Sequence, residues 1–176
     1  MAVDNARSSE ADRFLRARVP VSPEAIAALS TCHIPLPDWL TALAAEEEDA
    51  ILSCGQLLEL ADLVALALWE CEQASGETTA DSGATVCGNL SRALERALDN
   101  LLVGREVVVS DGWMMKDPDD DLQRPTVYRG KITSWKTAPT LTAALTRDSG
   151  SPMTASSHLW TVTDRTTGKV LFGPLP

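Results

Sequence analysis

Large apolar residues change their spacing at Gly104, and this change constrains the fold more than any other feature of the sequence. Before Gly104 they recur every three or four positions, which is the spacing of an amphipathic helix. After it they alternate with polar residues, as in a strand with one buried face. We therefore predict an α+β protein with an acidic helical region at 1–104 and an antiparallel β region at 105–176. A length of 176 residues fits one domain, or two small ones that share an interface.

Capping residues divide the first region into the helices of a bundle. Ser22 followed by Pro23 is typical of a helix N-terminus, and two prolines at 35 and 37 interrupt the helical pattern. A small polar loop is expected at 76–83, and Gly104 fits the left-handed position that follows a helix. The predicted helices cover 22–31, a short segment from 38, 51–71 and 86–102, while 10–18 is either a short helix or a frayed terminus.

Five short segments of the second region are rich in Val, Thr, Ile, Leu or Trp and are separated by turn residues. They cover 106–110, 126–136, 140–146, 158–163 and 169–172. Gly168 lies in a hairpin loop between the last two, where glycine allows a left-handed backbone. A region of about 70 residues with this pattern predicts a strongly curved antiparallel sheet or a small SH3-like β-barrel of about five strands.

Residues 51–71 form the most hydrophobic segment, and they bear on function as well as fold. Apolar residues cover nearly the whole circumference of the expected helix, so it must be buried on most sides. A region of about 100 residues has limited material to surround such a helix, which leaves part of it for another protein or a second copy of this chain. We predict that its partner-binding residues are Leu57, Leu60, Val64 and Leu68.

Three large apolar residues, Trp113, Met114 and Met115, stand in a segment that turn residues mark as a loop. Trp and Met are enriched in protein interfaces, and Met adapts to irregular partners. We predict that these three residues bind a partner. The alternative is that they pack over the sheet or against the helical region.

Familiar catalytic and metal-binding motifs are absent from the sequence, and we predict no catalytic residue, no metal site and no cofactor. Cys32 and His33 are adjacent, but neighbouring side chains usually point apart, and a cysteine at such a position is most often a small core residue. The acidic run 117–121 spaces carboxylates like the start of an EF-hand loop, but Leu122 and Tyr128 stand where that loop needs Gly and Glu. We expect a solvated loop there, with weak cation binding as the alternative.

The two regions differ in charge. Residues 1–104 hold 17 acidic and six basic side chains, a net charge of −11, whereas the remainder carries +1. The acidic region repels phosphate, so we do not expect nucleic-acid binding, and it would attract a basic partner. We expect no signal peptide, no membrane-spanning segment and a reducing, cytoplasmic compartment, because the chain lacks long apolar runs and its four cysteines are too few for a disulfide scaffold.

These observations favour a non-enzymatic interaction protein, such as an assembly, adaptor or virion component, which acts through the apolar helix and the apolar loop. Two alternatives stay open. The first is an acidic inhibitor that imitates nucleic-acid phosphates with an exposed ridge at 46–49. The second is a carboxylate- or metal-dependent enzyme, for which the candidate residues are Asp111, Asp117, Asp119, Asp121, His158 and Asp164.

Overall fold

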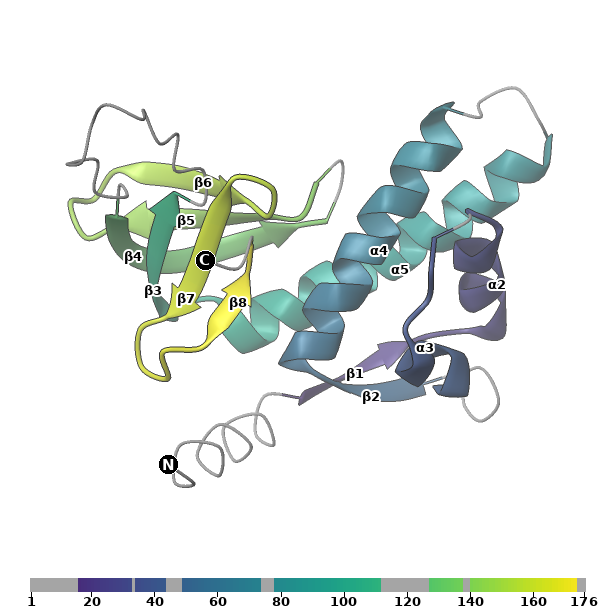
Figure 1. Cartoon of the computed structure of the whole chain (residues 1–176), viewed down its shortest axis with the longest axis horizontal. Coiled ribbons are helices and arrows are strands. Elements are labelled where there is room, and N and C mark those ends of the chain that lie inside the picture. The colour runs from purple at the N-terminus through teal and green to yellow at the C-terminus, as the bar shows by residue number, and fades with distance from the viewer. Residues whose placement is uncertain are drawn as a thin grey trace, which may run out of the picture.

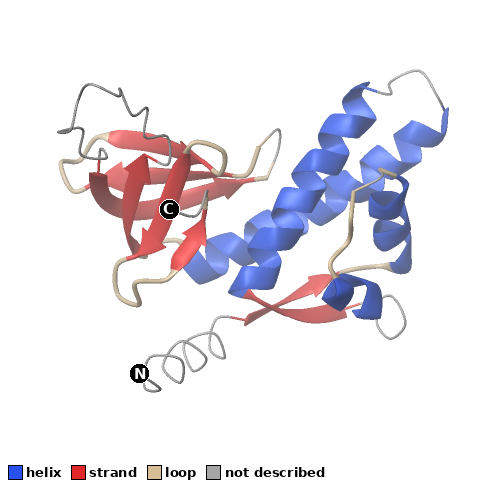
Figure 2. Cartoon of the chain, viewed as in Figure 1, coloured by secondary structure: helices blue, strands red, loops and turns tan. Residues whose placement is uncertain are grey.

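The computed structural model describes residues 16–32, 34–43, 49–73, 78–111, 127–137 and 140–173 (Figure 1). Helices and a pair of strands form the first half, and the described residues of the second half form strands and turns (Figure 2). The helices are α2 (Pro23–Thr31), α3 (Asp38–Leu43), α4 (Cys54–Gln73) and α5 (Thr78–Leu102). The strands are β1 (Arg16–Pro20), β2 (Asp49–Ser53), β3 (Glu106–Asp111), β4 (Val127–Lys136), β5 (Thr142–Arg147), β6 (Pro152–Ser156), β7 (Trp160–Asp164) and β8 (Val170–Phe172). This combination confirms the predicted α+β class.

Two helices begin at a capping serine. At α2, Ser22 Oγ accepts a hydrogen bond from Ala25 N–H at 3.1 Å and a proline occupies the first turn, as the sequence predicted. At α4, Ser53 and Gln56 cap each other: Ser53 N–H donates to Gln56 Oε1 at 3.0 Å, and Gln56 N–H donates to Ser53 Oγ at 3.3 Å. α4 therefore starts three residues later than predicted.

The first half is not wholly helical, because β1 and β2 pair as a two-stranded antiparallel ribbon. Val19 in β1 and both Ala50 and Leu52 in β2 are buried, and their neighbours along each strand reach solvent. The prediction of a helix over 10–18 is wrong for its described end, which belongs to β1. The ribbon joins segments about 30 residues apart, so the contacts that stabilise it are not visible in either segment alone.

α5 is longer than predicted and lies beside α4 (Figure 1). It begins at Thr78, inside the expected loop at 76–83, because Gly83 costs only about 1 kcal/mol in a helix whose later apolar residues bury one face. Its end agrees with the prediction, since Gly104 has a φ of 86°. Gly104 N–H donates to the Ile132 carbonyl oxygen at 2.8 Å, which ties the end of α5 to β4.

Strands β3 to β8 form one sheet in the order β6-β5-β4-β3-β7-β8, and every neighbouring pair is antiparallel. The described strands make an open antiparallel sheet, so of the two predicted forms, a curved sheet or a small barrel, they do not form the closed barrel. The sheet has one strand more than the five predicted, and the additional strand is β6. It begins with Pro152, a residue that weakens a strand signal but is tolerated at the start of an edge strand. A bulge between Ile132 and Ser134 shifts the β4–β5 register and bends β4. Gly168 has a φ of 70°, as the sequence predicted.

Side chains of α5 join the helical half to the sheet. Asp99 Oδ1 accepts a hydrogen bond from Trp135 N–H at 3.0 Å, and Glu95 Oε1 accepts one from Thr137 N–H at 2.8 Å. Ser91 and Thr137 hydrogen-bond through their hydroxyl groups. Burial raises the pKa of Asp99; the Trp135 hydrogen bond opposes this effect and the charge of Glu95 adds to it. The two halves therefore share a polar interface as well as a core.

Replacing Asp99 by alanine is expected to lower the free energy of unfolding by about 1–2 kcal/mol, because the backbone N–H of Trp135 would lose its acceptor inside the protein. Asp99→Asn keeps a side-chain oxygen and is expected to cost less. Urea titration followed by circular dichroism measures both variants. Equal losses would show that the hydrogen bond itself contributes nothing and that the charge of Asp99 carries the effect.

Candidate binding site

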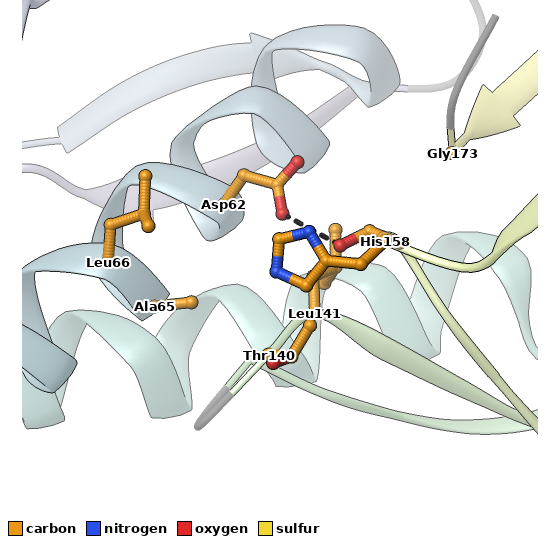
Figure 3. A pocket seen from close by; sticks show the side chains of 8 residues that line it. Asp62, Ala65, Leu66, Thr140, Leu141, His158 and Gly173 are labelled. Carbon is orange, nitrogen blue, oxygen red and sulfur yellow. Dashed lines mark hydrogen bonds between the residues drawn. The ribbon is translucent and has the colours of Figure 1, made fainter.

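A pocket of about 420 Å³ lies between α4 and the sheet (Figure 3). Asp62, Ala65 and Leu66 of α4 form one wall, and segments that adjoin β5, β6 and β8 form the other. Gly173 belongs to the second wall; its φ is 109° and a Cβ there would overlap the Trp160 carbonyl oxygen, so the position requires glycine. The remaining lining residues are Thr140, Leu141, Ser157 and His158.

Asp62 is the acidic group of this pocket. Ser157 Oγ donates a hydrogen bond to Asp62 Oδ1 at 3.3 Å, and His158 lies beside the same carboxylate (Figure 3). The surrounding protein displaces water from the carboxylate and so raises the pKa of Asp62, while Ser157 and His158 offset part of this effect. The Asp62 side chain still reaches solvent through the mouth of the pocket. An approaching group can therefore contact a carboxylate whose hydration is incomplete.

Three large exposed apolar side chains lie on or next to residues of the pocket. Leu66 and Trp69 lie one helical turn apart on α4 and are 46% and 51% exposed. Leu159 follows His158 in the turn before β7 and is 50% exposed. We call Leu66, Trp69 and Leu159 the α4 rim. Leu66 lines the pocket together with Asp62, and Trp69 lies one helical turn from Leu66, so the α4 part of the rim and Asp62 share one side of the helix.

The geometry of Asp62, Ser157 and His158 differs from that of a nucleophilic triad. In a nucleophilic triad the histidine stands between the hydroxyl and the carboxylate, whereas here the Ser157 hydroxyl donates directly to Asp62. Within the described ranges, no group of three or more His, Cys, Asp or Glu side chains is placed to hold a metal ion. The Asp62 carboxylate lies beside the apolar side chains of Ala65 and Leu66. This combination suits a cationic side chain with a hydrocarbon stem.

The α4 residues that the sequence assigned to partner binding lie in the chain's own core. Leu57, Leu60 and Val64 are fully buried, and Leu68 is half-buried against the same core. The first three are therefore not available to another protein. The face of α4 that reaches solvent carries the α4 rim instead.

Among the other candidates with a described position, Asp164 and Asp49 do not line this pocket. Asp164 is buried and pairs with Arg105 at 2.7 Å, which gives it a structural role, whereas His158 lines the pocket. Asp49 forms an exposed ion pair with Arg18 at 3.9 Å. The candidates outside the described residues are His33, Glu46, Glu47, Glu48, Trp113, Met114, Met115, Asp117, Asp119 and Asp121.

Sequence reasoning missed Asp62, Ser157 and the α4 rim as a site. An acidic residue within so apolar a segment was a usable signal for Asp62. Ser157 carried none, because it is 95 residues away from Asp62 and only the tertiary fold brings the two together. The side of α4 that carries Leu66 and Trp69 did have a signal, because the exposed acidic residues Glu59, Asp62 and Glu70 lie on that same side.

No protein-family model, curated protein or solved structure matches this chain. Of the helices that the structure describes, none has both the length and the apolar character needed to cross a membrane. A functional assignment therefore depends on the geometry of the pocket and its rim.

Proposed function

We propose that this chain is a non-enzymatic interaction protein that binds a partner polypeptide through the α4 rim and the Asp62 pocket. The observation that carries the proposal is the pair Leu66 and Trp69, two large apolar side chains about half exposed on one side of a helix. Tryptophan is enriched among the residues that dominate binding energy at protein interfaces. A cluster of large apolar side chains beside a pocket is typical of a contact surface, whereas single exposed apolar residues are ordinary.

The partner is expected to present a lysine or arginine next to an apolar residue. Asp62 offers a partly desolvated carboxylate to the cation, and Ala65 and Leu66 offer an apolar wall to its stem. The net charge of −11 over residues 1–104 attracts a basic partner and opposes the pairing of two such faces. For this reason the proposed partner is a different polypeptide rather than a second copy of this chain.

Selection from a phage-displayed peptide library against the full chain tests this proposal. We expect the enriched peptides to combine Lys or Arg with an adjacent large apolar residue. Trp69→Ser is expected to weaken their binding about 30-fold, since removal of an interface hot spot costs about 2 kcal/mol, and Leu66→Ser about tenfold. Asp62→Asn is expected to weaken the binding of peptides that carry Lys or Arg. It should leave unchanged the binding of peptides in which norleucine replaces that Lys or Arg. Isothermal titration calorimetry measures each affinity.

Val103→Ser is the matched control, because Val103 is also 46% exposed but follows α5 and does not line the pocket. It is expected to bind the peptides like the wild type. Binding should also weaken as the pH falls through the raised pKa of Asp62, above the ordinary aspartate value of 3.8. Rim variants that bind as tightly as the wild type would overturn the proposal. A dimer that Trp69→Ser dissociates in sedimentation would replace the foreign partner with a second copy.

A further inference from the structure

A second pocket, of about 580 Å³, lies on the sheet at the end of β4 and β5 that points away from α4 and α5 (Figure 1). The start of β4 forms one side of it, at Val127, Tyr128 and Arg129, and the end of β5 with the turn after it forms the other, at 147–149. None of these residues lines the Asp62 pocket. The second pocket is therefore separate from the site proposed for a partner polypeptide.

The backbone of both strands fixes the position of Arg147 in this pocket. Arg147 N–H donates a hydrogen bond to the Ser151 carbonyl oxygen at 2.9 Å, and Arg147 pairs with Gly130 across the strands. A Cβ at Gly130 would overlap the Thr146 carbonyl oxygen, so the close approach of the strands requires glycine there. Because Gly130 has no side chain, the Arg147 side chain can cross β4 and reach Tyr128, which lies on the same face of β4.

The Arg147 guanidinium lies over the Tyr128 ring, with its central carbon 4.2 Å from the ring centre. The Trp160 ring supports Tyr128 at a centre-to-centre distance of 5.9 Å. This contact uses the flat face of the guanidinium, whereas its N–H groups point outward in its plane. Within the part of the chain that the structure describes, the buried Nε–H of Arg147 has no hydrogen-bond partner. The adjacent carboxylate, that of Asp148, pairs with Arg165 at 3.9 Å instead.

The chemistry of the lining indicates which ligand would complete it. A buried donor without an acceptor is unfavourable, and an acceptor from outside the chain would remove this cost. The charged lining residues are Arg129, Arg147 and Asp148, a net charge of +1, which matches a ligand with a single negative charge. A guanidinium presents its N–H groups as a fork that fits the two oxygens of a carboxylate. Val127, which is 51% exposed, adds an apolar surface to the same pocket.

We propose that this pocket binds a carboxylate group attached to an apolar body. Arg147 holds the carboxylate oxygens, and Val127 contacts the apolar body. The ligand is either a small carboxylic acid or the C-terminal residue of a peptide, since both present the same group. Asp148 disfavours a doubly charged phosphate, and the net charge of −10 on the whole chain opposes polyanions such as nucleic acids.

Titration of the full, ¹⁵N-labelled chain with sodium phenylacetate, followed by NMR, tests the proposal. We expect the Arg147 Nε–H resonance to shift with a Kd of about 1 mM, an affinity reasonable for a ligand of about ten non-hydrogen atoms. Phenylacetamide has nearly the same shape without the charge and should leave this resonance unchanged. N-acetylphenylalanine imitates a peptide C-terminus. If it binds more tightly than phenylacetate the ligand is a peptide end, and if it binds more weakly the ligand is a small acid; both results support a carboxylate site.

Variants of Arg147 test its role directly. Arg147→Gln is expected to weaken phenylacetate binding at least about tenfold, because charged hydrogen bonds to the carboxylate are lost. Arg147→Lys keeps the charge but lacks the fork, and it should weaken binding about fivefold. Arg92→Gln is the matched control, since Arg92 is an exposed arginine of α5 that does not line the pocket, and it should bind like the wild type.

The comparison of phenylacetate with phenylacetamide uses the wild type alone, so it decides the proposal even if an Arg147 variant folds poorly. Equal affinity for the acid and the amide would overturn the proposal. Tighter binding of phenyl phosphate than of phenylacetate, or an Arg147→Gln protein that binds phenylacetate like the wild type, would also overturn it. So would an Arg147 Nε–H resonance that does not move at phenylacetate concentrations far above the expected Kd.

Discussion

Replacing Asp164 by alanine is expected to lower the free energy of unfolding by about 3 kcal/mol. The buried carboxylate accepts hydrogen bonds from Arg105 Nη1 at 2.7 Å and from the N–H groups of Thr166 and Thr167 at 2.8 and 2.9 Å. Alanine would leave the Arg105 charge and both backbone donors without this acceptor. The loss would affect the start of β3, which follows Arg105, as well as the β7–β8 hairpin. Urea titration of the two proteins at neutral pH measures the effect.

The same carboxylate gives stability a defined pH dependence. Burial alone would raise the pKa of Asp164, but hydrogen bonds from Thr167, Arg105 and Thr166 outweigh burial and hold the pKa below its ordinary value of 3.8. Its stabilising effect is therefore fully present above the ordinary value and is lost as the pH falls through the lowered one. The difference in stability between the wild type and Asp164→Asn should shrink as urea titrations move from about pH 6 to about pH 2.

A nearby surface ion pair provides the control for Asp164. Arg165 and Glu106 approach to 3.4 Å, but both side chains are more than two-fifths exposed. Because water screens such pairs, Arg165→Gln is expected to change the free energy of unfolding by less than about 1 kcal/mol. An Asp164→Ala loss no larger than that of Arg165→Gln would contradict the structural role assigned to the buried carboxylate.

Leu60→Ala is expected to lower the free energy of unfolding by about 3 kcal/mol, because Leu60 is fully buried and its truncation leaves a cavity in a close-packed core. Leu66 is the matched comparison, since it is the same residue type on the same helix but 46% exposed. Leu66→Ala is expected to cost less than about 1 kcal/mol in stability. Urea titration compares the two variants directly.

The pair of leucines also tests where the surface of α4 lies. Leu66→Ala should weaken the binding of peptides selected against the chain while leaving the protein stable. If it destabilises the fold as much as Leu60→Ala does, the Leu66 side of α4 is covered within the folded chain. In that case the α4 rim would not be a surface for a partner.

Local signals predicted the elements that local contacts decide. The start of α2 depends on a hydrogen bond between residues three positions apart, Ser22 and Ala25, and the end of α5 depends on the backbone of Gly104. α3 begins at the predicted Asp38, directly after the break that the prolines impose. In each case the determining residues are within one helical turn of the boundary, so the sequence contains the whole cause.

Elements that depend on distant partners could not be predicted in this way. β1 carries few apolar residues and becomes a strand because it pairs with β2, where Val19 lies opposite Ala50. The pocket exists because Asp62 and Ser157 meet across the boundary between helices and sheet. Periodicity along the chain contains none of these pairings.

The central place of β3 in the sheet means that the sheet cannot be completed until late in synthesis. β3 pairs with β4 on one side and with β7 on the other, so Val109 faces both Tyr128 and Val162. A ribosome releases β7 about 50 residues after β3, and until then one edge of the growing sheet has open backbone groups that a neighbouring nascent chain could occupy. Between the synthesis of β3 and that of β7, this open edge is therefore exposed to pairing with another chain.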